Sequence, residues 1–167
     1  MTITFLPFTE DNIYASTRLM ERAFNEDSMM HRGVNDGPTG YNDGSFLRRY
    51  ALNPDADAYI IMGDGKQIGV TVLWIDREHN ENFLGCLFTD PELHSRGIGT
   101  IIWRKIEEMY PDTVIWRTET PLCSIRNLNF YINKCGFMAY KIDDPENRDE
   151  AIVKLIKYTD NFMSKGV

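Results

Sequence analysis

The first half of the chain alternates between helical and strand-like patterns of hydrophobic residues. Apolar residues three and four positions apart follow Thr9, a common N-cap residue, and predict a helix that ends near Asn25. Continuous apolar runs predict strands, and the Asp64-Gly65 pair between two of them is typical of a tight hairpin turn. The predicted elements are a strand at 3–8, a helix at 9–25, a short helix at 45–52, and strands at 57–63, 68–76 and 83–89.

The second half of the chain predicts two helices and three strands. Ile98, Ile102 and Ile106 have helical spacing in a helix predicted at 97–110, which Pro111 ends. A strand at 113–118, a helix at 122–134 and strands at 137–142 and 151–158 follow. This order predicts an α/β fold, in which helices flank a mixed, mostly antiparallel central sheet in a single domain at 1–167.

Residues 25–44 break the periodic pattern. This stretch is rich in Gly, Asn and Asp, so the sequence predicts a loop or a series of short turns there. Long loops in compact domains are often functional lids, and 25–44 is a candidate for one. A mobile surface loop without a function would have the same composition.

Composition and charge exclude some classes of protein. The net charge of −7 excludes a broad nucleic-acid surface, which would need a basic face. No apolar run approaches the roughly 20 residues that span a bilayer, and the N-terminus lacks the pattern of a signal peptide. The three cysteines are widely spaced and are expected to be buried free thiols in a reducing compartment. These features favour a cytoplasmic protein without membrane contact.

The segment 93–102 (LHSRGIGTII) places Gly97 and Gly99 directly before a predicted helix. Glycines at such a junction let backbone N–H groups turn inward, and with the helix N-terminus they form an anion site that suits phosphates. The segment matches neither the P-loop nor the Rossmann fingerprint. An ordinary tight turn would explain two glycines equally well.

The wider context of these glycines resembles the GNAT acetyltransferase superfamily. In that family a strand and a proline precede the pattern Gln/Arg-x-x-Gly-x-Gly/Ala, which corresponds here to residues 94–99, with His94 in place of Gln or Arg. A later helix of the family ends in Tyr-x-x-x-x-Gly-Phe, which corresponds here to Tyr131, Gly136 and Phe137. The two motifs stand in the family's order, and the predicted elements fit the family along nearly the whole chain.

The resemblance implies acetyl-CoA as the acetyl donor and an amine of a small molecule or peptide as the acceptor. The amine would attack the thioester directly in a ternary complex. The loop 94–100 would bind the pyrophosphate through backbone amides, and the preceding strand would pair with the pantetheine arm. The cofactor-binding residues implied in this way are Leu87, Phe88, Thr89, His94, Ser95, Arg96, Gly97, Ile98, Gly99, Thr100, Asn127 and Tyr131. No metal site is implied.

The resemblance also implies a catalytic role for Tyr131, close to the cofactor sulfur. A phenol with a pKa of about 10 is a reasonable proton donor to a departing thiolate whose own pKa is about 8.5. A core tyrosine is the alternative. On the predicted helix, one face is expected to lie in the core, namely Ile125, Leu128, Ile132 and Cys135.

The general base is not fixed by the motifs. The family often has a carboxylate at the position of Phe83, and Glu81 lies two residues earlier on the same face of the strand. Glu119 is an equal candidate, although it also suits a helix entry. Glu26 and Asp27 come third, and a water chain would need none of them. An acceptor site is expected between 25–44 and the turn at 77–82, with apolar walls and acidic side chains at Met29, Met30, Tyr41, Glu26, Asp27, Asp36 and Asp43.

Two other classes of function fit the same pattern. One is a catalytically silent acyl-CoA sensor on this fold, which the missing carboxylate at Phe83 favours and Tyr131 disfavours. The other is a partner-binding domain without a cofactor. Dimerisation through sheet edges is common in the family, so a homodimer is an open possibility.

Overall fold

A computed structural model describes residues 1–165, which divide into two compact units. The first unit comprises Met1–Trp74 and Gly85–Arg96, and the second comprises Ile75–Leu84 and the residues from Gly97 onward. Strand β4 (Glu81–Thr89) contributes its first residues to the second unit and its last residues to the first. The prediction of a single domain at 1–167 stays a prediction.

The strands form a seven-stranded sheet in the hydrogen-bonded order β1-β2-β3-β4-β5-β7-β6. Strands β4 and β5 are parallel, whereas β1–β2, β2–β3, β5–β7 and β6–β7 are antiparallel. The sheet is therefore mixed and mostly antiparallel with helices flanking it, which confirms the predicted fold class.

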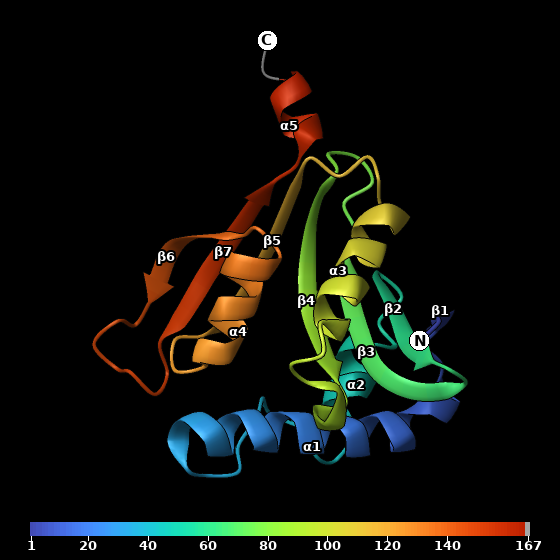
Figure 1. The fold of residues 1–167 in the computed structure, drawn as a ribbon, viewed down its shortest axis with the longest axis vertical. Helices are drawn as coiled ribbons and strands as arrows, with labels where there is room; N and C mark the ends of the chain where they lie inside the picture. The colour runs from blue at the N-terminus through green and yellow to red at the C-terminus, as the bar shows by residue number, and fades with distance from the viewer. Residues whose placement is uncertain (166–167) are drawn as a thin grey trace. The chain divides into compact units, whose positions relative to one another are not determined.

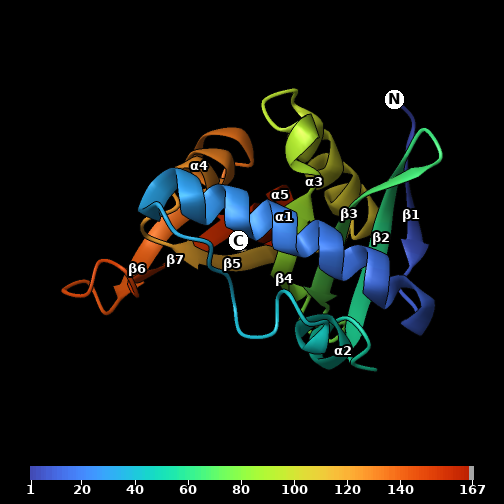
Figure 2. The same cartoon turned by 90° about the horizontal axis from the view of Figure 1, so that it is seen from below.

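The first unit combines the first strands of the sheet with two helices. Its elements are β1 (Ile3–Pro7), η1 (Glu10–Asn12), α1 (Ile13–Arg32), α2 (Ser45–Tyr50), β2 (Ala56–Gly63), β3 (Lys66–Trp74), the end of β4 and the turn η2 (Pro91–Leu93). Figure 2 shows α1 running in front of β2 and β3 and across them. Met20 of α1, Leu47 of α2 and Val70 of β3 are fully buried in one hydrophobic cluster, which fixes α1 to this part of the sheet.

The second unit is built around aromatic side chains. Its further elements are α3 (Ile98–Met109), β5 (Ile115–Pro121), α4 (Ile125–Asn129), the π-helical turn η3 (Phe130–Lys134), β6 (Met138–Asp143), β7 (Ile152–Tyr158) and α5 (Asp160–Lys165) (Figure 1). Trp103 of α3 and Trp116 of β5 are buried, with ring centroids 5.3 Å apart. Phe137 lies 5.2 Å from Trp103, so three rings fill the space between α3, β5 and the end of η3.

Helix α1 is longer than the sequence predicts. It continues through Arg32, so the prediction of a loop over 25–44 is wrong for its first eight residues. Asn25, Asp27 and Ser28 favour turns in isolation, but they lie within the helix, and Ser28 is buried whereas Met29 and Met30 beyond it are exposed. Gly33 then ends the helix with a left-handed φ of 72°, and its N–H bonds to Met29 O at 3.1 Å.

The helix predicted at 122–134 is shorter and changes its period. It begins at Ile125, and from Phe130 the N–H of Cys135 bonds five residues back to Phe130 O, at 3.0 Å. This π turn rotates the later residues relative to an α-helix. Tyr131 and Cys135 are buried, whereas Ile125 is 61% exposed and Ile132 37% exposed. The predicted core face is therefore wrong at these two isoleucines.

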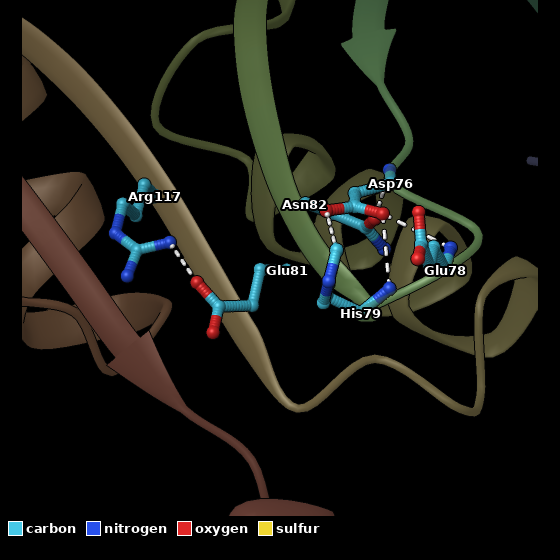
Figure 3. A network of polar contacts seen from close by, with 6 residues as sticks. All are labelled: Asp76, Glu78, His79, Glu81, Asn82 and Arg117. Carbon is cyan, nitrogen blue, oxygen red and sulfur yellow. Dashed lines mark hydrogen bonds and ion pairs between the residues drawn. The ribbon is translucent and has the colours of Figure 1, made fainter.

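The turn before β4 is organised by two polar side chains (Figure 3). Asp76 Oδ1 accepts the backbone N–H groups of Glu78 and His79, both at 2.9 Å. Asn82, which is 2% exposed, accepts the N–H of Asp76 at 3.0 Å and donates to Thr113 Oγ1 at 2.7 Å. Asn82 therefore ties this turn to the residues that lead into β5.

Asn82→Ala is expected to lower the free energy of unfolding by about 2–3 kcal/mol, because it leaves a backbone N–H and the hydroxyl of Thr113 without this partner. Denaturant unfolding of the variant measures the loss. Asn133→Ala is the matched control, since Asn133 is exposed and bonds only locally to Asn129 in the described network, at 2.8 Å. Equal stabilities of the two variants would contradict the role given to Asn82.

Candidate active site

The loop before α3 has the backbone geometry of an anion site. Ser95 and Gly97 both have positive φ, at 64° and 75°, and Gly97 is the N-cap of α3. The first i→i−4 bond of the helix runs from Ile101 N to Gly97 O at 3.2 Å, so the amides of residues 98–100 precede it. Those amides and the positive end of the helix dipole suit a diphosphate.

Glycine occupies the two positions Gly97 and Gly99 of the loop for different structural reasons. A Cβ added at Gly97 would meet no heavy atom within 4 Å, so its left-handed backbone rather than space requires glycine there. A Cβ added at Gly99 would lie 3.0 Å from the Phe130 ring, so a larger residue there would require this ring to shift. The space beside the Gly97 backbone is therefore open.

The last residues of β4 are held against β3 in the first unit. Thr71 Oγ1 donates to Cys86 O at 3.1 Å, and Asp90 N donates to Ile68 O at 2.8 Å. Phe88 is buried, and its ring lies 6.2 Å from that of Phe24 on α1. Leu87 and Thr89, the other two predicted residues of this strand, are half-buried.

His94 begins the loop and contacts helix α1. Its Nδ1 lies 2.8 Å from Glu26 Oε2, and Arg22 Nη2 lies 2.8 Å from Asp90 Oδ2. The sequence named Glu26 only as a third candidate base, and nothing in the pattern pairs residues so far apart in the chain. This hydrogen bond and the Arg22–Asp90 ion pair bring α1 and the turn η2 together.

Tyr131 is buried in the second unit, with 7% of its surface exposed. Its ring lies 5.1 Å from that of Phe130 and 5.7 Å from that of Phe137. Asn127 is half-buried one turn earlier on α4, and Lys134 is exposed. Tyr131 lies within the π turn, which a sequence read with a helical period of 3.6 residues does not reveal.

Both carboxylates proposed first as general base are engaged with a cation. Glu81 Oε2 lies 2.7 Å from Arg117 Nη1, and Figure 3 shows the two side chains pointing toward one another from β4 and β5. Glu119 of β5 contacts Lys154, its direct neighbour on β7. Hydrogen bonding to Glu119 raises the pKa of Lys154, with Asp143 adding to it, so this lysine stays charged.

Several of the side chains expected to line the acceptor site form hydrogen bonds with other residues of the protein. Tyr41 OH donates to Asn25 Oδ1 at 2.8 Å. Hydrogen bonds from Arg32 and Gly37 lower the pKa of Asp36, and hydrogen bonds from Ser45 lower the pKa of Asp43. Met29 and Met30 are exposed, by 49% and 58%. The acceptor site predicted from these residues stays a prediction.

The cysteines differ in how far they are shielded. Among residues 1–165 all three are free, but only Cys135 is fully buried, since Cys86 and Cys123 are half-buried. Desolvation raises the pKa of the Cys86 thiol to about 12, and that of Cys135 to about 12 with a smaller contribution from Glu107. In this part of the chain no group of three His, Cys, Asp or Glu residues could hold a metal ion.

These thiol pKa values predict the order of alkylation by iodoacetamide at pH 8. A thiol with a pKa near 12 has roughly a thousandfold less thiolate than an ordinary thiol. Cys123 is therefore expected to react first in the folded protein, and all three at similar rates in denaturant. Peptide mass spectrometry after short exposures gives the order. Labelling of Cys86 as fast as Cys123 in the folded protein would contradict it.

Comparison with known proteins places this fold and loop in one family. The sequence model of the Acetyltransferase (GNAT) family matches residues 17–137, and the chain belongs to this family. The match spans the loop and ends at Phe137, the last residue of the second motif. The resemblance inferred from those two motifs is thereby confirmed.

The individual relatives either match only half of the chain or have low sequence identity to it. An uncharacterised Bacillus subtilis (strain 168) protein, YrkN, is 50% identical over 84 residues, which are 50% of this chain and 45% of YrkN. The chain thus matches less than half the length of that relative. An acetyltransferase structure from Thermus thermophilus has a TM-score of 0.72 at 15% identity, covering 95% of this chain and 98% of its own. An N-acetyltransferase from Thermoplasma acidophilum, solved with coenzyme A, has a TM-score of 0.72 at 17% identity and 95% and 100% coverage.

Among the described residues, no helix is both long enough and apolar enough to cross a membrane.

Proposed function

We propose that this chain is an N-acetyltransferase that moves the acetyl group of acetyl-CoA to a primary amine of a small molecule or peptide. Its membership of the GNAT family supports acetyl transfer. The observation that supports acetyl-CoA as the donor is the loop at Ser95 and Gly97, where positive φ angles precede the amides that begin α3. A diphosphate is the part of coenzyme A that such a loop binds.

The proposed roles follow the loop and the two motifs. The diphosphate binds to backbone groups of the loop, namely His94, Ser95, Arg96, Gly97, Ile98, Gly99 and Thr100. The pantetheine arm pairs with the end of β4, at Leu87, Phe88 and Thr89. The cofactor is also contacted by Asn127 from α4 and by Tyr131 from η3. The cofactor supplies an activated acetyl thioester, and the protein orients it.

The reaction needs one proton removed and one supplied. The lone pair of the neutral acceptor amine forms the new C–N bond and the nitrogen loses one proton, while the C–S bond breaks and the sulfur takes one proton. We assign the second proton to the phenol of Tyr131. Glu81 or Glu119 would take the first directly or through water, provided that each leaves its ion pair with Arg117 or Lys154.

A catalytically silent acyl-CoA sensor is the second candidate. Phe83 stands where the family often has a carboxylate, and both nearby glutamates are in ion pairs, which favours a protein that binds the thioester without using it. This candidate shares the cofactor loop with the enzyme and differs from it only in catalysis.

Calorimetric titration of the purified protein with acetyl-CoA tests both candidates. Binding in the micromolar range is expected, because backbone amides and a helix dipole receive the diphosphate. A folded protein that binds no acetyl-CoA would contradict both.

We also propose that residues 1–167 act as one acetyltransferase domain in the cytoplasm, without nucleic-acid or membrane partners. The free cysteines and the negative net charge support this setting. A homodimer is compatible with it.

A further inference from the structure

An ion pair and a hydrogen bond join one face of α1 to both ends of the turn η2. Arg22 and Glu26 are one helical turn apart on α1, and Asp90 and His94 flank Pro91–Leu93. Arg22 meets Asp90 and Glu26 meets His94, each at 2.8 Å. All four residues belong to the first unit. The arrangement holds the turn at two points.

The turn between these two points is itself fixed by hydrogen bonds. Asp90 Oδ1 accepts the N–H of Glu92 at 3.1 Å, and Leu93 N donates to Asp90 O at 2.9 Å. His94 N donates to Pro91 O at 3.0 Å. The backbone of His94 is therefore set by the turn, and the ring is set by Glu26.

The hydrogen-bonded pair of Glu26 and His94 is partly shielded from solvent. The His94 side chain is 23% exposed and that of Glu26 38% exposed. A carboxylate only accepts hydrogen bonds, so the bond places a proton on His94 Nδ1. Partly shielded hydrogen bonds to a charged group contribute more than exposed pairs do.

The residue after His94 explains why fixing this ring matters. Ser95 has a φ of 64°, a conformation that costs energy for a residue other than glycine. Strained backbone persists only where its surroundings hold it, and the anchors nearest to Ser95 on its N-terminal side are the turn and the bond from His94 to Glu26. Without that bond the start of the loop gains conformational freedom, which ligand binding must then remove.

We propose that Glu26 is a positioning residue for the cofactor loop, acting through His94 Nδ1 to hold the start of the loop in the conformation that binds a diphosphate. This inference rests on the proposed function. It gives His94, which departs from the Gln or Arg of the family pattern, a partner on α1. The Arg22–Asp90 pair holds the other end of the same turn.

The test is the affinity for coenzyme A, measured by calorimetry, with the unfolding temperature of every variant recorded. Glu26→Ala is expected to weaken binding about tenfold. Glu21→Ala is the matched control, because Glu21 also lies on α1 but pairs locally with Arg18 at 3.1 Å, and its affinity should equal that of the wild type. Equal affinities of the Glu26 and Glu21 variants would overturn the inference.

A second pair of variants separates positioning from direct contact. Asn and Leu have similar shapes, and the Asn amide nitrogen occupies the place of His Nδ1, so His94→Asn keeps the donor to Glu26 and His94→Leu removes it. We expect His94→Asn to bind coenzyme A about tenfold more tightly than His94→Leu. Equal losses in both would mean that the ring itself contacts the ligand, which would overturn the role of Glu26.

The wild type separates this inference from the proposed function. A folded wild type that binds no coenzyme A removes the proposed function and the inference with it. A wild type that binds, with Glu26→Ala binding equally well, removes the inference alone.

Discussion

Gly97→Glu is expected to weaken the binding of acetyl-CoA by about a hundredfold or more while the protein stays folded. The new carboxylate would stand at the N-terminus of α3, where the amides of residues 98–100 receive a diphosphate, and would repel it. A Cβ at Gly97 meets no neighbouring atom within 4 Å, so the first atom of the new side chain has room. It costs only the strain of a left-handed residue, about 1 kcal/mol. Calorimetric titration of the variant measures the loss.

Gly65→Glu is the matched control for this experiment. Gly65 has a φ of 83° in the β2–β3 turn, and a Cβ there also meets nothing within 4 Å. The control therefore carries the same charge change and a similar strain away from the loop. Unchanged affinity in Gly65→Glu with a large loss in Gly97→Glu is the expected result. Wild-type affinity in Gly97→Glu would show that the loop does not bind the diphosphate.

Tyr131→Phe is expected to lower kcat about a hundredfold or more with little change in the KM for acetyl-CoA. Removing the phenol removes the proposed proton donor to the leaving thiolate, and general acids typically contribute factors of this size. The ring remains, so its packing against Phe130 and Phe137, at 5.1 and 5.7 Å, is kept. Initial rates of thiol release at saturating acceptor measure the effect.

Tyr140→Phe is the control for the loss of a phenol, because Tyr140 is 55% exposed on β6. Its kcat should match that of the wild type. If Tyr131→Phe also keeps the wild-type kcat, Tyr131 is a core residue and the sulfur takes its proton from elsewhere.

Most of the fold could be predicted because local chemistry specifies it. The hairpin at Asp64-Gly65 follows from two residues that accept positive φ, and the structure has φ values of 48° and 83° there. Gly97 was predicted at the start of α3 and is its N-cap. The spacing of apolar residues predicted the order of strands and helices, because each such element buries one apolar face.

The errors arose where tertiary contacts override local preference. Asn25, Asp27 and Ser28 favour turns in isolation, yet burial of Ser28 and the cap at Gly33 carry α1 through Arg32. The π turn at Phe130–Lys134 has no sequence period of its own, so the exposure of Ile132 could not be foreseen. The bond between Glu26 and His94 joins residues 68 positions apart, a pairing that only the folded chain reveals.

Transfer of the acetyl group itself is the central claim, and mass spectrometry of the acceptor tests it most directly. The protein would be incubated with acetyl-CoA and a panel of primary amines that includes polyamines, aminoglycosides, amino acids and a peptide with a free N-terminus. We predict one or more N-acetylated amines, formed in equal amount with free coenzyme A thiol and lost in Gly97→Glu. Binding of acetyl-CoA without cleavage of the thioester against any amine of the panel would contradict the enzyme and favour the silent sensor.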